Sequence, residues 1–483
     1  MNQTHIQVEA VTNGGTVIGN AAEVHLQTTN VYTAGMESSV ADYYIQVAAD
    51  CKLHTVHAAI GGEEASIRSP RTAQVYVTPD VWIVEKASKK TKSDAVEPET
   101  RKRVPLSDCL ASAESGFQRI VLTASSGMGK TTTVNMQVVA LAKNESVPWM
   151  VLRLPSLLGP DLSGTKLVMT ALERDIQAKL TKDAADSATI ARELIRRLDA
   201  RSGVILFDAL DEVPEAERQR VLAAVTDFLD DRNEARSDHR VVLTSRPYAY
   251  QGDSVWLLAK KGFTRVELAS FTPEQRDELI DQYFSKVVNR QEIGDAMKRQ
   301  VASGANGDIA VLLEEPMLLT YACMLATATA NGEPIGNAKL AAPLPSTRYK
   351  LFDGLVSLML EKWDSRRDLK EVKPFGVLFN SNGGRSALRK VLERAAYWEA
   401  MQRPVVEKKY IPRERRTLSH ERLVTLTDDA MPSDLPVRAK DVVNWLAERS
   451  GLVPRVQYGA IVGYQLHKQL QSFLAVGELR ALG

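Results

Sequence analysis

The feature that most constrains the fold is a glycine-containing stretch, ASSGMGKTT, at residues 124–132. It follows the apolar run at residues 120–122 and precedes apolar residues at helical spacing, so it is predicted to join a buried strand to a helix. Gly127 and Gly129 allow the backbone to curl until several N–H groups face one hollow, where the helix N-terminus adds its positive dipole. The stretch therefore predicts a phosphate-binding loop.

The loop also carries side chains that suit a polyphosphate and its metal. Lys130 is predicted to reach the β- and γ-phosphates, and the Thr131 hydroxyl is predicted to bind Mg²⁺. The usual pattern G-x-x-x-x-G-K-[ST] begins with glycine, whereas this chain has Ala124. The alternative interpretation, a turn with a solvated lysine, is disfavoured by the strand-loop-helix context. The predicted phosphate contacts are Ser126, Gly127, Met128, Gly129, Lys130, Thr131 and Thr132.

Three acidic residues follow a later buried strand at residues 204–207. Asp208 ends that strand and is predicted to bind Mg²⁺ together with Thr131. Asp211 or Glu212 is predicted to orient or deprotonate the attacking water. The alternative is an acidic loop that caps the next helix, and the position downstream of a phosphate loop favours the catalytic interpretation.

A basic residue follows the next strand. Arg246 comes directly after the apolar strand at residues 241–244, so it emerges at the same sheet edge as Lys130 and Asp208. It is predicted to contact the γ-phosphate. A surface arginine in a salt bridge is the alternative.

The order of strand and helix patterns predicts the fold class. We expect an α/β P-loop NTPase with a doubly wound parallel sheet, then an α-helical domain and a winged-helix domain, after a small β-rich N-terminal segment. Residues 1–105 are predicted to hold a β-rich arm, a helix and a charged linker, and residues 106–285 the nucleotide-binding domain. Residues 286–365 are predicted to form the helical domain and residues 366–483 the winged-helix domain.

Local patterns refine the prediction for the N-terminal region. Residues 38–51 have helical spacing, whereas residues 74–77 and 81–84 resemble strands. The basic stretch at residues 86–103 is predicted to be a solvated linker, with a nucleic-acid contact as the alternative. No aromatic residue interrupts that stretch, which weakens the nucleic-acid alternative. Further along, Thr272 and Pro273 have the pattern of a helix start.

Composition narrows the functional classes. The 61 Lys+Arg and 60 Asp+Glu leave a formal charge of +1, so no global field favours nucleic acid, although a local basic patch stays open. Three widely spaced cysteines indicate neither a disulfide framework nor a zinc site, and the N-terminus lacks a secretory signal. The uncharged run at residues 317–330 is shorter than the roughly 20 residues that span a bilayer. We therefore expect a cytoplasmic protein with no membrane partner.

Several motifs in a fixed order carry a family resemblance. The chain has ASSGMGKTT (124–132), VILFDALDE (204–212), VVLTSRP (241–247), EEPMLL (314–319), LPSTRYKLFDGLVSLMLEKW (344–363) and YQLHKQLQSFLA (464–475). This series resembles the NACHT family of STAND NTPases in its bacterial form. The match runs from about Ile120 to the C-terminus. Two departures are Ala209, where the family commonly has glycine, and Ser472, where it often has glutamate.

The resemblance implies an ATP-dependent switch. Such a protein holds ADP in its inactive state, exchanges it for ATP, rearranges its domains and self-associates on activation, and the family suggests a role in antiphage defence. By this resemblance Lys130 and Thr131 belong to the Walker A motif, and Asp208, Asp211 and Glu212 to Walker B. The remaining assignments are Arg246 as sensor 1, Pro316 as the proline against adenine, and His467 as the winged-helix histidine that contacts the β-phosphate.

Three functions stay open from the sequence. The first is a switch with slow, regulatory ATP hydrolysis, the second is a nucleotide-binding scaffold that oligomerises without turnover, and the third is an AAA-like motor. The residues do not distinguish ATP from GTP and do not identify the trigger ligand. Residues 1–105 contain no metal-ligand cluster and no nucleophile with its base, so no effector activity is assigned to them.

Overall fold

The computed structural model describes most of the chain from residue 39 onward. The described residues are 39–52, 72–84, 101–111, 117–125, 127–144, 146–159, 162–235, 239–247, 249–250, 252–303, 307–331, 343–345, 347–361, 382–401, 418–433, 437–446, 453, 455–458, 461–464, 466 and 468–482. Two of the predicted site residues, Ser126 and His467, lie outside them.

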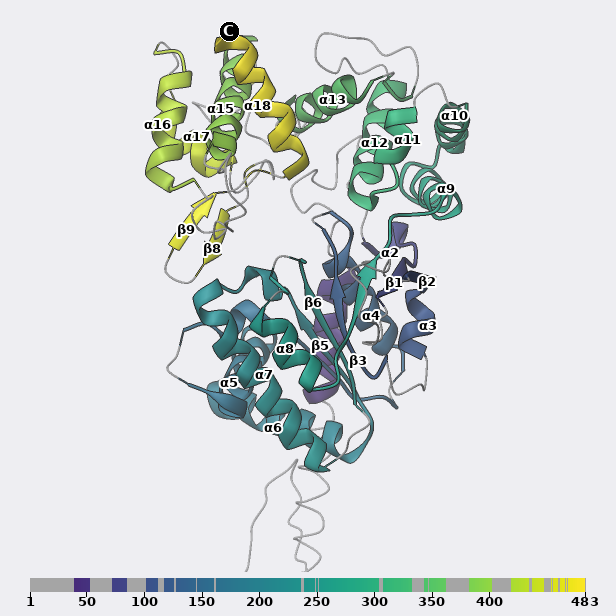
Figure 1. Cartoon of the computed structure of the whole chain (residues 1–483), viewed down its shortest axis with the longest axis vertical. Coiled ribbons are helices and arrows are strands. Elements are labelled where there is room, and N and C mark those ends of the chain that lie inside the picture. Colours follow the sequence, from purple (N-terminus) through teal and green to yellow (C-terminus); the bar gives the residue numbers. More distant parts are fainter. Residues whose placement is uncertain are drawn as a thin grey trace, which may run out of the picture.

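A seven-stranded sheet forms the centre of the described structure (Figure 1). Its strand order is β2-β1-β7-β3-β6-β5-β4, and the strands from β7 to β4 run parallel. Because β6 lies between β3 and β5, the strand ends that carry the predicted site residues are neighbours. The strands are β1 (Asp80–Val84), β2 (Arg101–Pro105), β3 (Arg119–Thr123), β4 (Trp149–Arg153), β5 (Val204–Asp208), β6 (Arg240–Ser245) and β7 (Thr264–Leu268).

Helices enclose β3, β4, β5 and β6, which explains why the centres of these parallel strands are continuous apolar runs rather than alternating ones. In β3, for example, Ile120, Val121 and Leu122 are all fully buried. Figure 1 shows α5 to α8 on one side of the sheet and α3 and α4 on the other. These helices are α3 (Leu106–Ala111), α4 (Lys130–Leu141), α5 (Gly164–Leu180), α6 (Ala184–Ala200), α7 (Glu215–Ala235) and α8 (Asp253–Lys260).

The segment before the phosphate loop differs from its prediction in two places. Residues 74–77 do not form a strand, because α2 (Thr72–Val75) is helical and the chain then runs without regular structure to β1. Short apolar runs do not distinguish strand from helix by periodicity alone. The predicted linker is also too long, since residues 101–103 belong to β2, which pairs antiparallel with β1. The sheet therefore begins N-terminal to residue 106.

One residue of β2 explains why its basic sequence is part of the sheet. The Arg103 guanidinium donates to Asp80 Oδ2 at 2.8 Å and to the Ser270 carbonyl oxygen at 2.8 Å. It also lies over the Trp82 ring, 5.6 Å from the centroid. These contacts fix the antiparallel pair of β1 and β2 to the chain that leaves β7.

The predicted N-terminal helix is confirmed over residues 39–52. The Tyr44 ring stacks on Trp149 with 4.2 Å between centroids, and its hydroxyl accepts a hydrogen bond from the Trp149 N–H at 3.1 Å. Trp149 begins the edge strand β4. The helix therefore covers a sheet edge that would otherwise expose unpaired backbone groups.

The described residues after β7 are mostly helical and lie above the sheet in Figure 1. Thr272 and Gln275 form a capping box at the start of α9, with Pro273 at its first position, as predicted. The other elements include a two-stranded hairpin, β8 (Arg455–Tyr458) and β9 (Ile461–Tyr464), between α17 and α18. The helices are α9 (Pro273–Gln282), α10 (Gln291–Ala302), α11 (Gly307–Leu312), α12 (Pro316–Ala330), α13 (Arg348–Glu361), α15 (Asn382–Met401), α16 (His420–Ala430), α17 (Ala439–Trp445) and α18 (Lys468–Leu482).

Helix α12 forms the centre of this second part. Every residue from Met317 to Ala328 is buried, so the uncharged run is a core helix. Within the described residues, no helix combines the length and apolar character needed to cross a bilayer. Helices α9 to α18 share one apolar cluster, which also includes Val75 and Val77, whereas the sheet and its helices share another.

Candidate nucleotide site

The phosphate loop leaves β3 and enters α4 through two left-handed glycines. Gly127 has φ +82° and Gly129 has φ +90°, a backbone region that strains residues with a Cβ. Lys130 starts α4, and its ammonium group donates to the carbonyl oxygens of Ala124 at 2.9 Å and Ser125 at 3.2 Å. The Lys130 side chain therefore folds back onto the loop, at a helix N-terminus that favours anions.

Asp208, at the end of β5, is the centre of a hydroxyl cluster. Thr131 donates to its Oδ2 at 3.2 Å, and Thr244 of β6 donates to its Oδ1. The Thr244 oxygen also accepts the Ala209 N–H at 2.9 Å. Asp208 is 3% exposed, and this burial raises the pKa of its carboxyl, while the two hydroxyls and the charge of Arg153 oppose the rise.

The turn after Asp208 directs two more carboxylates to the same sheet edge. Ala209 has φ +67°, a left-handed conformation that is rare for a residue with a Cβ. A short 3₁₀ turn (Leu210–Glu212) follows, in which the Glu212 N–H donates to the Ala209 carbonyl oxygen at 3.1 Å. Asp211 is buried, whereas the Glu212 side chain is half-exposed.

Each of these two carboxylates forms an ion pair with an arginine. Arg246, which follows β6, places its Nε 2.8 Å from Asp211 Oδ2. Arg153, at the end of β4, places its Nη2 2.5 Å from Glu212 Oε2. Arg153 is directly opposite Asp208 in the β4–β5 register, so its position follows from the strand pairing. The candidate site therefore holds two cations beside Lys130.

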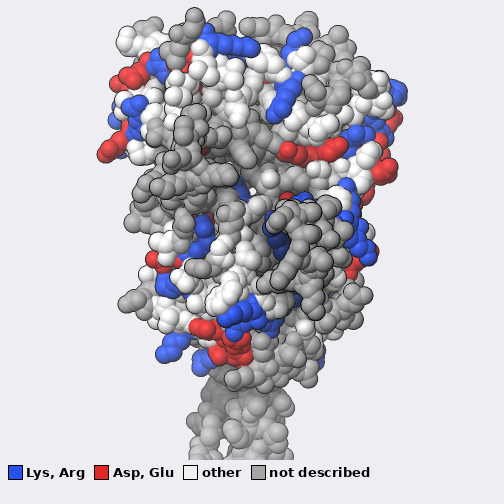
Figure 2. All heavy atoms as spheres, viewed as in Figure 1, with Lys and Arg blue, Asp and Glu red and all other residues white. Residues whose placement is uncertain are grey.

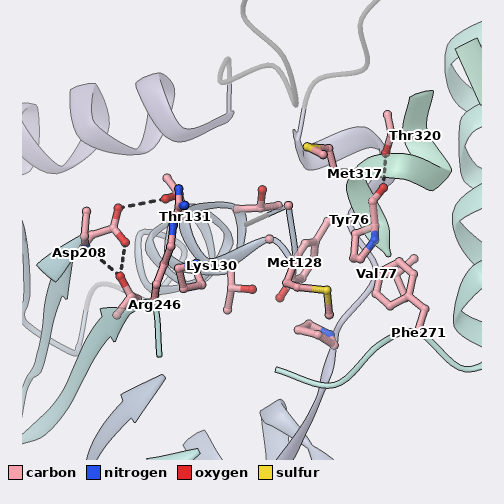
Figure 3. Close-up of a pocket in the computed structure, with 18 of the residues that line it drawn as sticks. Tyr76, Val77, Met128, Lys130, Thr131, Asp208, Arg246, Phe271, Met317 and Thr320 are labelled. Atoms are coloured by element: carbon pink, nitrogen blue, oxygen red, sulfur yellow. Dashed lines mark hydrogen bonds between the residues drawn. The ribbon is translucent and has the colours of Figure 1, made fainter. Parts of the chain in front are cut away.

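A cavity of about 260 Å³ extends from this charged cluster to the start of α12 (Figure 3). At the far end Figure 3 shows Tyr76, Val77, Phe271, Met317 and Thr320, which come from three segments distant in sequence. Burial raises the pKa of the Tyr76 phenol to about 12, so this hydroxyl keeps its proton near neutral pH.

The helical part contacts the phosphate loop directly at this cavity. The Met317 N–H donates to the Gly127 carbonyl oxygen at 3.3 Å. A Cβ at position 127 would lie 3.0 Å from Met317 Cε. Pro316 lines the cavity at the N1 position of α12, and Thr320 donates to its carbonyl oxygen at 2.9 Å.

Most of the predicted site residues line this one cavity. Its walls include Gly127, Met128, Gly129, Lys130, Thr131, Thr132, Asp208, Asp211, Glu212, Arg246 and Pro316. Sequence reasoning missed Thr244, Arg153, Tyr76, Val77, Phe271 and Met317. A signal existed for the first two, because both lie at strand ends next to Asp208. The others gave none, since apolar residues on separate segments become neighbours only in the folded chain.

The donor set suits a hard cation beside a polyphosphate. The Thr131 hydroxyl and the Asp208 carboxylate are oxygen ligands from two elements, 3.2 Å apart. The described residues contain no group of three or more His, Cys, Asp or Glu placed to hold a metal. That arrangement suits Mg²⁺, which is usually bound by one or two protein ligands, waters and substrate phosphates. The apolar far end of the cavity suits a base, so the whole cavity fits a Mg²⁺-nucleotide.

The strand order and the geometry of the loop define the fold of the sheet domain as that of a P-loop NTPase. Neither a protein-family model nor a curated protein matches the sequence.

Similar solved structures include a chain of Drosophila ORC bound to DNA, with 15% identity, TM-score 0.31 and coverage of 78% of this chain and 94% of that chain. Cdc6p from Pyrobaculum aerophilum has 14% identity and TM-score 0.27, covering 76% of this chain and 88% of that one. A RuvB variant from Thermotoga maritima has 13% identity and TM-score 0.29, covering 75% of this chain and 87% of that one.

Proposed function

We propose that this chain is an ATP-dependent signalling switch of the NACHT type. It binds ATP or ADP with Mg²⁺, hydrolyses ATP slowly, and couples the bound nucleotide to rearrangement of its helical part and to self-association. The observation that carries the proposal is the position of the cavity, whose walls come from both the sheet and α12. A ligand there contacts both parts, so ATP and ADP can favour different arrangements of them.

Phosphate binding is assigned to the loop and the start of α4. In this proposal the backbone N–H groups of residues 127–132 cradle the phosphates, and Lys130 exchanges its two carbonyl acceptors for phosphate oxygens. Thr131 and Asp208 hold Mg²⁺, which neutralises charge on the β- and γ-phosphates when it is bound. Pro316 and Met317 lie against the base.

Hydrolysis is assigned to the acidic turn and to Arg246. Glu212 takes a proton from the attacking water, Asp211 orients the turn, and Arg246 stabilises charge on the γ-phosphate. Glu212 and Arg246 are both held in ion pairs, with Arg153 and Asp211 respectively. Both must change partners before they can act, which is consistent with slow turnover.

The resemblance to bacterial NACHT proteins extends the proposal to a role in antiphage defence, and His467 would close the switch on the β-phosphate. This extension is tested in a bacterial host that expresses the chain. We expect phage plating to fall with the wild-type protein and to recover with Lys130→Ala. Equal plating with both proteins would remove the defence role while leaving nucleotide binding open.

The nucleotide assignment is tested with purified protein. Lys130→Ala should lose copurifying ADP and ATP and bind a fluorescent ADP analogue about 100-fold more weakly, because a charged phosphate contact is removed. Lys182→Ala, which changes an exposed lysine outside the cavity, should bind like the wild type.

If Lys130→Ala kept its nucleotide, the phosphate-loop assignment would be wrong. Turnover that rises steeply with added DNA or unfolded polypeptide would instead support a motor. Competition by GTP as effective as that by ATP would show that the base end does not select adenine.

A further inference from the structure

A second hollow lies between α15, α16 and α18 and shares no lining residue with the nucleotide cavity. Its volume is about 430 Å³, within the usual range of small-molecule sites. Tyr397 and Trp398 of α15 form part of its wall, and the exposed side chain of Met401 lies beside them. The hollow therefore offers aromatic and apolar surface to a ligand.

Two arginines with few protein partners face the same hollow. The Arg422 guanidinium lies over the Trp398 ring, 5.8 Å from its centroid, and forms no ion pair with any described residue. Arg394 Nε is 3.6 Å from Glu478 Oε1, a long contact, while Lys390 holds the same carboxylate at 2.6 Å. Both guanidinium groups thus keep N–H donors for an anion, and a planar fork of donors suits phosphate oxygens.

The charged side chains that line the hollow are Arg394 and Arg422 on one hand and Glu478 and Asp429 on the other. Lys390, outside the lining, pairs with Glu478 at 2.6 Å, so its charge offsets that of one of the two carboxylates. Asp429 also lines the hollow, so it can accept hydrogen bonds from ring N–H groups or sugar hydroxyls. Aromatic side chains bind planar bases by stacking.

We propose that this hollow is a binding site for a nucleoside monophosphate or a similar planar aromatic phosphate. The ring lies against Tyr397 and Trp398, the phosphate lies on Arg394 and Arg422, and Asp429 accepts from the sugar or base. The site does not depend on the phosphate loop, so it can be tested separately from the proposed ATPase function.

The first test uses the full chain with Lys130→Ala and EDTA, which remove phosphate-loop binding. AMP, GMP, CMP and UMP are each titrated by calorimetry, with adenosine and inorganic phosphate as comparators. At least one monophosphate should bind with a Kd below about 1 mM, and at least tenfold more tightly than either comparator. Failure of all four, or equal binding of inorganic phosphate alone, overturns the proposal.

The second test changes the arginines. Arg394→Gln and Arg422→Gln should each weaken binding about tenfold or more, and Arg422→Lys should recover part of the loss. Arg480→Gln is the matched control, because that guanidinium lies over the Tyr349 ring at 5.4 Å and outside the hollow.

Near-ultraviolet circular dichroism checks that each variant keeps its fold. If a variant does not fold, the proposal is decided by the titrations of the Lys130→Ala chain with monophosphates, adenosine and inorganic phosphate. Undiminished binding in both glutamine variants overturns the proposal. So does a glutamate-rich peptide that binds where the monophosphates do not.

Discussion

The two ends of the nucleotide cavity are built from opposite contributions to stability. At the phosphate end a carboxylate is buried at Asp208 and a residue with a Cβ is held at positive φ at Ala209, and both features are unfavourable for folding. At the base end Val77, Phe271 and Met317 belong to the apolar cluster of the helical part, so their burial favours folding.

This contrast explains why the site residues at one end of the cavity can be recognised in the sequence and those at the other end cannot. Residues that are unfavourable for folding stand out against the pattern of a strand or helix, as Asp208 does at the end of a buried strand. Residues that favour folding look like any other core residue. The proposed catalytic groups are therefore visible as motifs, whereas the wall proposed to bind the base is hidden among apolar positions.

The largest expected effect tests the chemistry of the phosphate end. Glu212→Gln keeps the size of the side chain but removes the base, so ATP turnover should fall about 10²- to 10⁴-fold while ADP affinity stays within about twofold. Single-turnover hydrolysis and fluorescent ADP titration measure the two quantities. Glu217→Gln on α7, outside the cavity, is the control. Unchanged turnover would mean that another residue is the general base. Unchanged duration of the signalling output despite lost turnover would favour the scaffold function.

The next effect tests the stability cost of Asp208. Because its pKa is raised in the folded state, the ionised carboxylate lowers stability at pH values above that pKa, and this cost is lost as the pH falls through the folded-state pKa. Asp208→Asn should raise the free energy of unfolding by about 1–2 kcal/mol without Mg²⁺, while abolishing Mg²⁺-dependent hydrolysis.

Urea unfolding at several pH values measures this gain, which should shrink in acid. Asp230→Asn is the control, since that carboxylate is partly exposed and paired with Lys261. A destabilised Asp208→Asn would show that the hydroxyl cluster outweighs the burial of charge.

A smaller effect tests the base end. Pro316→Ala removes a ring from the wall of the cavity and should weaken adenosine, ADP and ATP by the same factor, about three- to tenfold, because one apolar contact of roughly 1 kcal/mol is lost. Pro273→Ala, at the equivalent first position of α9, is the matched control outside the cavity. A loss of affinity that grows with the number of phosphates would show that the two ends of the cavity do not act independently.

The smallest effect concerns Ala209. Ala209→Gly should stabilise the protein by about 0.5–1 kcal/mol, because relief of the left-handed strain exceeds the added chain entropy of glycine. Ala188→Gly, within α6, should destabilise it by a similar amount. Thermal unfolding compares the two variants. A destabilised Ala209→Gly would mean that the turn is not strained.

Local patterns predicted the parallel strands of the sheet better than the segment that contains β1 and β2. The loop, Asp208 and Arg246 were placed correctly at one sheet edge because parallel strands end together. Residues 74–77 were wrongly predicted as a strand, since a four-residue apolar run has no periodicity that excludes a helix. Arg103 was assigned to a linker, because nothing local reveals that the Asp80 carboxylate and the Ser270 carbonyl oxygen accept its hydrogen bonds. Such pairings depend on segments far apart in sequence.

The hydrogen bond between α12 and the phosphate loop makes the Met317 amide proton a reporter of the contact between them. Pro316 has no N–H, so Met317 carries the first amide proton of α12, and that proton has no acceptor within the helix. Its acceptor is instead the Gly127 carbonyl oxygen. The hydrogen-exchange rate of the Met317 amide therefore measures how often α12 separates from the phosphate loop.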